Sequence, residues 1–381
     1  MPNPSEKLQK LMGRYAFNPW EKSSPTYLSL EEFKNMGMTL AREGADLRIT
    51  ETIIGTEETF LHFLVLYNEK GKNQEEIEEL LRLNSTIINV KNGLEQTLLQ
   101  SLMNQFIRKE CSLEDFKKTA LFLAKRGIDL SVTDTEDIKG TLIHHFVLNN
   151  KNGENDKEIA ELLQINPTLI NILDGYGRIP LQSLLRKESD ATIHTIEKLI
   201  DLGSNINSKC PNNITLLHSC CFAGNLTAAK YFASQGLDLK ARAKGKTMLH
   251  SSVRHKNADL WEWILNNEIN IDAQDDLGDT TLHFAAANRN SVMIEWLILN
   301  NADSNLLNNQ GVTALQIAQE CEFPEITSIL IKLNAKDLSL PKIENSIDTN
   351  TKISNSTARF FNSEGRKETF DNSSVSNLQG P

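Results

Sequence analysis

The amino-acid sequence predicts an all-α repeat solenoid, and three observations support this fold class. A short sequence box recurs at near-constant intervals along the 381-residue chain. A second landmark, an apolar helix end followed by a turn, accompanies most copies of the box. Apolar residues within each copy follow helical spacing. Because one helix pair cannot bury such an apolar face alone, neighbouring copies are expected to stack.

The box is clearest in the C-terminal half, where four copies lie 32 or 33 residues apart. They read TLLH (215–218), TMLH (247–250), TTLH (280–283) and TALQ (313–316). Looser copies occur upstream at intervals of 36 to 44 residues: TFLH at 59, TLLQ at 97, TLIH at 141 and IPLQ at 179. The longer upstream intervals indicate insertions in the early repeats.

The residues around the box predict how each repeat begins. A threonine stands where a helix must start, and its oxygen accepts an otherwise unpaired backbone N–H group. A glycine two residues earlier suits a tight turn. A leucine after the threonine is expected to face inward. The positions are Thr215, Thr247, Thr280 and Thr313; Gly245, Gly278 and Gly311; and Leu217, Leu249, Leu282 and Leu315.

The second landmark marks where each repeat ends. Copies read LIDLGSNIN (199–207), FASQGLDL (232–239) and LILNNADSN (297–305). An earlier copy, LAREGADL (40–47), has no clear box before it, which indicates the tail of a degenerate first repeat.

Box and landmark together resemble the ankyrin repeat, whose pattern is G-x-T-P-L-H-x-A-A, a second helix, then L-L-x-x-G-A-D. The resemblance covers residues 28–337 and implies about eight helix-turn-helix units with β-hairpin fingers, the early ones degenerate with insertions. The sequence departs from the pattern in places. Proline fills its slot only at Pro180, and Asn301 and Glu268 replace the turn glycine in two repeats.

Three regions are predicted along the chain. Residues 1–27 form an N-terminal segment in which a capping helix is expected to cover the first repeat. Residues 28–337 form the repeat domain, divergent to about residue 210 and regular over 211–337. Residues 338–381 are polar and rich in Ser and Asn, so we expect a disordered tail. The apolar residues of the capping helix are Leu8, Leu11, Met12, Tyr15, Phe17 and Trp20.

Composition limits the class of function. The net charge of -10 disfavours nucleic acid or an anionic membrane as a general partner. Five scattered cysteines favour a reducing compartment. The N-terminus has no apolar signal peptide, and apolar runs such as FLVLY (63–67) are far shorter than the roughly 20 residues of a membrane helix. We therefore expect a cytoplasmic, monomeric protein without membrane insertion.

Residues of reactive type have structural interpretations. Five histidines share one slot of the repeat, and the family resemblance implies that they hydrogen-bond neighbouring units. Cys220 and Cys221 align with alanines and are read as small core residues. Three tryptophans in second helices are read as packing residues. No catalytic or nucleotide-binding motif is present. We expect no enzyme activity, no cofactor and no metal. The histidines are His62, His144, His218, His250 and His283, and the tryptophans are Trp261, Trp263 and Trp296.

The resemblance implies that partners bind the fingertips and the exposed end of the first helices. Carried over slot by slot, the candidate partner-binding residues are Tyr176, Arg178, Arg186, Lys187, Asn212, Phe222, Arg242, Lys244, Lys246, Arg254, His255, Asp276, Leu277, Asp279 and Asn288. Repeats four and six present basic residues there. One interpretation is a solvated charged face. The other is an acidic segment of a partner along repeats four to seven, anchored by Tyr176 and Phe222.

The predicted function is a non-catalytic protein-binding scaffold or adaptor. In its abundant Asn, Lys and Ile and its polar tail, the chain is similar to ankyrin effectors that intracellular bacteria deliver into the host cytoplasm. In such proteins the tail would serve as the secretion signal. Two alternatives stay open. One is an enzyme housed in the divergent half, residues 1–190, and the other is a regulatory ankyrin subunit of an endogenous complex.

Overall fold

The structure, a computed structural model, describes residues 3–16, 29–53, 56–68, 71–136, 139–151, 153–185 and 192–337. The predicted tail, residues 338–381, lies outside the described residues, and so do Phe17 and Trp20 of the predicted capping segment. The chain divides into two compact units. The first contains residues 1–184 and 191–205, and the second contains residues 185–190 and 206–381.

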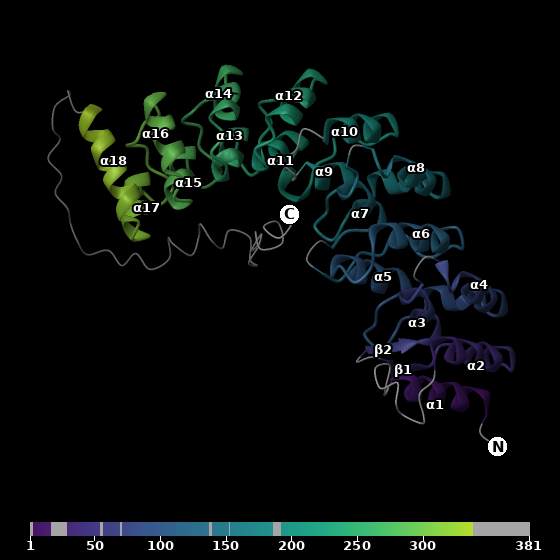
Figure 1. The fold of residues 1–381 in the computed structure, drawn as a ribbon. Coiled ribbons are helices and arrows are strands. Elements are labelled where there is room, and N and C mark those ends of the chain that lie inside the picture. Colours follow the sequence, from purple (N-terminus) through teal and green to yellow (C-terminus); the bar gives the residue numbers. More distant parts are fainter. Residues whose placement is uncertain are drawn as a thin grey trace. The chain divides into compact units, whose positions relative to one another are not determined.

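The first unit consists of helices in two rows, with one small hairpin (Figure 1). Its helices are α1 (Pro4–Ala16), α2 (Leu30–Arg42), α3 (Phe60–Leu66), α4 (Gln74–Leu83), α5 (Leu98–Ile107), α6 (Leu113–Ala124), α7 (Leu142–Leu148), α8 (Asp156–Ile165), α9 (Pro180–Leu184) and α10 (Thr192–Asp201). The 3-10 helices η2 (Ser85–Asn89) and η3 (Pro167–Asn171) follow α4 and α8. In one row α3 packs on α5 and α7 on α9, and in the other α2 packs on α4 and α6 on α8.

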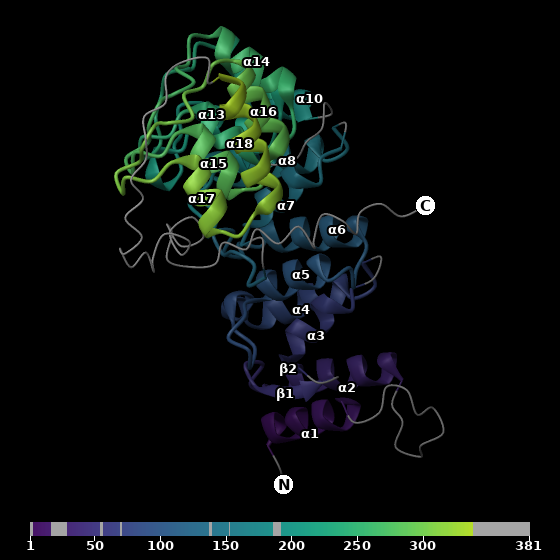
Figure 2. The ribbon, with the colours of Figure 1, turned by 90° about the vertical axis from the view of Figure 1, so that its left-hand side faces the viewer.

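The hairpin is the first finger of the repeat array. Strands β1 (Thr50–Ile53) and β2 (Thr56–Thr59) pair antiparallel, with Thr50 opposite Thr59. Helix α1 lies against β1 and α2 (Figure 2). It buries Leu8, Leu11 and Met12, which expose 3% of their surface or less. The first helix of the chain therefore adds an apolar face to the start of the stack.

In its described part, the second unit repeats one helix pair four times, from α11 to α18 (Figure 1). Its first helices are α11 (Leu216–Phe222), α13 (Met248–Ser251) with the 3-10 helix η5 (Ser252–Arg254), α15 (Thr281–Ala287) and α17 (Ala314–Glu320). Its second helices are α12 (Leu226–Ser234), α14 (Ala258–Asn266), α16 (Ser291–Leu299) and α18 (Pro324–Asp337). A short 3-10 helix, η4 (Pro211–Asn213), precedes α11. The predicted all-α repeat solenoid is confirmed.

The box threonines begin the first helices, as their residue type predicts. Thr215 Oγ1 accepts a hydrogen bond from the His218 backbone N–H at 3.4 Å. Thr313 Oγ1 accepts one from the Gln316 N–H at 3.3 Å. Each bond satisfies a backbone donor that the helix itself leaves unpaired.

The box leucines face the core in three of the four regular repeats. Leu217, Leu249 and Leu282 expose 2% of their surface or less. Leu315 is only half-buried, so the prediction is wrong at that position. Within the described residues no further repeat follows α17 and α18, so the face that would cover Leu315 has no neighbour there.

Each box histidine hydrogen-bonds both the threonine of its own box and the backbone of the next repeat. Nδ1 lies 2.8 to 2.9 Å from the oxygen of the box threonine. Nε2 lies 3.0 to 3.2 Å from a backbone carbonyl oxygen of the next repeat. Because a carbonyl only accepts, Nε2 must carry the proton, and Nδ1 accepts from the threonine hydroxyl. The accepting carbonyls belong to Gln96, Arg178, Lys246, Asp279 and Val312.

Gln100 performs the same task in the second repeat, where it replaces histidine. In the second repeat, Gln100 Nε2 donates to the Thr133 carbonyl at 2.9 Å. Its Oε1 accepts the Thr97 backbone N–H at 3.0 Å. One side chain again caps the helix start and reaches the next repeat, without a titratable group.

A longer duplication of about 82 residues runs through the first unit. Helices α2, α3, α4 and α5 of one copy correspond to α6, α7, α8 and α9 of the next. Buried Lys34 on α2 pairs with Glu76 on α4 at 2.8 Å. Buried Lys117 on α6 pairs with Glu158 on α8 at 2.9 Å. The two copies therefore share both their helices and an ion pair between second helices.

Finger stacking predicts different costs for two equivalent glycines. A Cβ on Gly278 (φ +76°) would lie 2.6 Å from the Asn309 backbone nitrogen, whereas a Cβ on Gly311 (φ +74°) would meet nothing within 4 Å. Gly311→Ala is expected to cost about 1 kcal/mol for the left-handed backbone alone. We expect Gly278→Ala to cost about 2 kcal/mol more, because the next finger must move. Urea denaturation of both variants measures the difference, and equal costs would contradict this account.

Candidate functional site

Consecutive fingers in the second unit are bonded through their backbones. The Asn309 N–H of the eighth finger donates to the Leu277 carbonyl of the seventh at 3.0 Å. The Asp276 N–H of the seventh donates to the Lys244 carbonyl of the sixth at 3.4 Å. These bonds use backbone groups at the tips, so side chains are the groups left to contact a partner.

An acidic or amide side chain holds the turn of each of the last two fingers. Asp275 Oδ1 accepts from the backbone N–H groups of Leu277 (2.8 Å) and Asp279 (3.0 Å). Asn308 Oδ1 accepts in the same way from Gln310 and Val312. Because these anchoring side chains are buried, the fingertips are presented on a fixed support.

The sixth repeat carries a concentrated positive charge. Residues 239–258 contain six Lys or Arg residues and no Asp or Glu, although the whole chain has a net charge of -10. This stretch runs from before the sixth finger, through α13 and η5, to the start of α14. Lys244 at the fingertip and Arg254 at the end of η5 are both exposed. Like charges gathered in one repeat raise the local potential felt by an anionic ligand.

Two of these cations lie over aromatic rings. The Arg254 guanidinium lies 5.2 Å from the centre of the Phe222 ring of the preceding repeat. Lys246 Nζ lies 4.6 Å from the ring centre of Phe284 in the following repeat. Both rings are half-buried. A cation over an aromatic face is held in place by the ring. We name Phe222, Lys244, Lys246, Arg254 and Phe284 the basic–aromatic surface.

Comparison with known proteins agrees with this architecture. The family model for ankyrin repeats (3 copies) matches residues 187–275 and 259–341, which contain the four regular boxes and their fingers. Residues 187–341 of the chain are ankyrin repeats. Over 156 residues, or 41% of its length, it is 23% identical to the Transient receptor potential cation channel subfamily A member 1 homolog of Caenorhabditis elegans. The matched stretch spans 12% of that relative's length.

Most predicted contact residues of the fifth to seventh ankyrin repeats are exposed or half-exposed. Asn212, Asp276 and Asn288 are exposed, and Leu277 and His255 are half-buried. His255 packs over Gly224, where a Cβ would lie 2.9 Å from its ring. The exposed Arg242 is also structural: its Nη1 donates to the carbonyls of Gly245 and Gln274, both at 3.0 Å.

Asp279 corrects one expectation. It is predicted to be an exposed partner-binding residue, but it exposes only 5% of its surface. Its Oδ1 accepts a hydrogen bond from Asn308 Nδ2 at 2.7 Å. The expectation of an exposed Asp279 is wrong because this carboxylate joins the seventh and eighth fingers instead.

The predicted contact residues of the fourth ankyrin repeat lie in the first unit or outside the described residues. Arg178 forms an ion pair with the buried Asp174 at 2.8 Å, and its side chain is 13% exposed. Its guanidinium also lies 4.6 Å from the centre of the Tyr176 ring. These contacts hold the fourth finger together. Arg186 and Lys187 lie outside the described residues.

The box histidines and the thiols of Cys220 and Cys221 are buried in neutral form. Burial lowers the pKa of His62, His144 and His250 to about 4. Burial raises the pKa of the Cys220 and Cys221 thiols far above the neutral range. A buried, protonated thiol is a poor nucleophile and metal ligand. Among the described residues, no group of three or more His, Cys, Asp or Glu side chains is placed to hold a metal ion.

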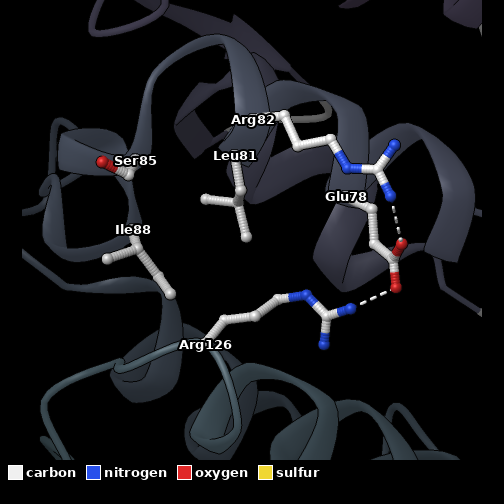
Figure 3. Close-up of a pocket in the computed structure, with 6 residues that line it drawn as sticks. All are labelled: Glu78, Leu81, Arg82, Ser85, Ile88 and Arg126. Atoms are coloured by element: carbon white, nitrogen blue, oxygen red, sulfur yellow. Dashed lines mark hydrogen bonds and ion pairs between the residues drawn. The ribbon is translucent and has the colours of Figure 1, made fainter.

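The second helices of the first unit border a small pocket that the sequence analysis missed. It has a volume of about 260 Å³ and is lined by Glu78, Leu81, Arg82, Ser85, Ile88 and Arg126 (Figure 3). Sequence inspection at the 33-residue period does not reveal it. Comparison at the 82-residue period does, because most of its polar residues lack a polar counterpart in the second copy.

In addition, no helix in the described ranges is long and apolar enough to cross a membrane.

Proposed function

We propose that the protein is a non-catalytic scaffold whose fifth to seventh ankyrin repeats bind an acidic segment of a partner protein. The observation that carries this proposal is the run of six basic and no acidic residues over 239–258 in a chain of net charge -10. The family supports protein binding in general, since ankyrin repeats present an extended surface to other proteins.

The basic–aromatic surface suits a segment that mixes acidic and apolar side chains. Arg254 and Lys246 lie over aromatic rings of two different neighbouring repeats. A partner carboxylate then gains a cation that is already oriented, so less side-chain freedom is lost on binding. The half-buried rings of Phe222 and Phe284 offer apolar area beside those cations.

Charge reversal tests this surface. We expect Lys244→Glu with Arg254→Glu to weaken binding of a fluorescein-labelled peptide containing Glu, Asp and Phe by roughly 10- to 100-fold at low salt. The control Lys230→Glu with Lys332→Glu makes the same charge change on exposed residues of α12 and α18. Fluorescence anisotropy gives the affinities. Equal weakening by both pairs would reduce the effect to net charge, and unchanged affinity in the first pair would remove the proposal.

The same pair of variants applies to partners recovered from eukaryotic cell lysate by affinity purification and mass spectrometry. A physiological partner of this surface is retained by the protein and by the α12/α18 control but lost by the charge-reversed variant. Rising salt concentration is expected to narrow the difference in partner binding between the charge-reversed variant and the control, because exposed ion pairs are screened within about 8 Å at physiological ionic strength.

The delivery of this protein into a host cell is a separate hypothesis. It rests on the composition of the chain and on residues 338–381, which lie outside the described residues. A translocation reporter fused to the chain with and without residues 338–381 tests it. If both fusions enter the host cell equally, the tail is not the signal.

A further inference from the structure

The pocket in the first unit lies between α4, η2 and the turn that follows α6. Its apolar wall consists of Leu81 and Ile88, which expose 9% and 7% of their surface. Its polar rim consists of Glu78, Arg82, Ser85 and Arg126 (Figure 3). Both guanidinium groups reach Glu78 from different sides, so the rim is a row of two cations with one carboxylate between them.

The guanidinium groups of Arg82 and Arg126 differ in how many contacts they make within the protein. Arg126 forms an ion pair with Glu78, donates to the Phe122 carbonyl at 3.1 Å and lies 3.7 Å from the centre of the Phe122 ring. Arg82 is 80% exposed and meets Glu78 only at 3.5 Å. Since a guanidinium has five N–H donors, Arg82 retains donors for a ligand while Arg126 is fixed by the protein.

The second copy of the 82-residue duplication serves as an internal comparison. There Leu163 and Ile170 replace Leu81 and Ile88 and are also buried, so the scaffold preserves the apolar wall. At the rim, however, Glu78, Arg82 and Ser85 correspond to Ala160, Gln164 and Pro167. Arg126 corresponds to Leu202, 76 residues later, because each directly precedes the glycine of its turn, Gly127 and Gly203. The duplicated fold therefore forms without a charged rim, and the charges of the first copy need an explanation other than folding.

The net charge and the size of the pocket restrict its ligand. Two arginines and one glutamate give the rim a net charge of one positive unit, which a single carboxylate neutralises. A phosphate dianion would bring excess negative charge close to Glu78. The volume of about 260 Å³ is below the roughly 300–1,000 Å³ of pockets for drug-sized ligands, so one residue fits rather than a cofactor.

We propose that this pocket binds a peptide carboxylate carried beside an apolar group, with Arg82 pairing the carboxylate and Leu81 and Ile88 receiving the apolar carbons. Planar guanidinium donors match a carboxylate in bidentate fashion. The carboxylate belongs to a free peptide C-terminus with an apolar last residue or to a glutamate side chain. This site is independent of the basic–aromatic surface in the second unit.

Methyl NMR of the full chain, labelled at Ile and Leu methyl groups, tests the site with small probes. N-acetyl-leucine represents a free C-terminus, N-acetylglutamic acid α-amide represents a glutamate side chain, and N-acetyl-leucinamide lacks the carboxylate. We expect saturable shifts of the Ile88 and Leu81 methyl signals with one of the two acids, at a Kd on the order of millimolar for such small fragments. The acid that binds more tightly identifies the source of the carboxylate.

A matched pair of arginine variants separates the pocket from general charge. Arg82→Gln removes the side chain proposed to pair with the carboxylate. It is expected to lower the affinity for the acid probe at least about fivefold. Arg42→Gln is the control, because Arg42 is 55% exposed, pairs with Glu79 on the same α4 helix and does not line the pocket. Thermal unfolding of both variants checks that the fold is retained.

The proposal fails on any of three results. Equal binding of N-acetyl-leucine and N-acetyl-leucinamide would remove the role of the carboxylate. Tighter binding of inorganic phosphate than of either acid would assign the rim to a different anion. Equal weakening by Arg82→Gln and Arg42→Gln would reduce the effect to net charge.

Discussion

Acidification from about pH 7 to about pH 5 is expected to destabilise the repeats by several kcal/mol through the box histidines. Burial lowers the pKa of His62, His144 and His250 to about 4, and it also lowers the pKa of His218 and His283. In each, Nε2 already donates to a carbonyl and Nδ1 accepts from a hydroxyl. A second proton on Nδ1 would remove that acceptor.

The direction follows from the two states of each imidazole. Above its ordinary pKa of about 6.5, the imidazole is neutral in both states and its contribution to stability is complete. Between about pH 6.5 and pH 4 the unfolded chain binds a proton that the folded chain excludes, so stability falls as pH falls. The three histidines with a folded pKa near 4 together lower the free energy of unfolding by about 4 kcal/mol for each pH unit inside this window.

Urea denaturation at several pH values, followed by circular dichroism, measures this dependence in both units, because His62 and His144 lie in the first unit and His250 lies in the second. His250→Gln is the matched variant, because Gln100 fills the same slot with equivalent bonds. It is expected to keep most stability at neutral pH and to reduce the pH slope by about 1.4 kcal/mol per pH unit. An unchanged slope in His250→Gln would show that other groups cause the acid sensitivity.

Replacement of Trp261 by alanine is expected to lower the free energy of unfolding by about 3–5 kcal/mol. Trp261 on α14 is fully buried, and its ring centre lies 5.6 Å from that of Trp296 on α16 of the next repeat. Truncation therefore leaves a cavity between two neighbouring second helices. In a stack of repeats, loss of one interface also weakens the cooperation between its neighbours.

Circular dichroism during urea denaturation gives the cost. Trp263→Ala is the control: it removes the same side chain from the same helix, but Trp263 is only half-buried, so we expect about 1–2 kcal/mol. Trp261→Phe is expected to cost much less stability than Trp261→Ala. It keeps an aromatic ring and removes an indole N–H that is buried without a hydrogen-bond partner. Equal costs for Trp261→Ala and Trp263→Ala would contradict the burial argument.

The repeat architecture was predictable because its signals are local. Thr215 and Thr313 cap helices through bonds to residues three positions away, so their role depends on little else in the chain. The histidine slot was also predictable, since five copies of one residue at one position indicate one structural task. Leu315 departed from its pattern because its burial needs a following repeat.

The candidate surface was predictable in position but not in detail. Lys244 and Arg254 are exposed where the repeat pattern places contact residues. Asp279 occupies the same kind of position, yet Asn308, 29 residues later in the chain, buries and bonds it. The role of Phe284 as the ring beneath Lys246 was missed, because its slot holds Ser219 and Ser251 in the two preceding repeats.

The sequence by itself determined the repeat, its period, the helix starts and the neutral interior positions of His and Cys, because each depends on residues within one repeat. Only the tertiary structure decided which charged side chains remain available and which are consumed by the next repeat. Asp279 bonds to the buried Asn308 of the next finger, whereas Arg82 keeps donors at the rim of a pocket. Stacking brings such groups together across 30 to 50 residues of chain, and no local pattern encodes that distance.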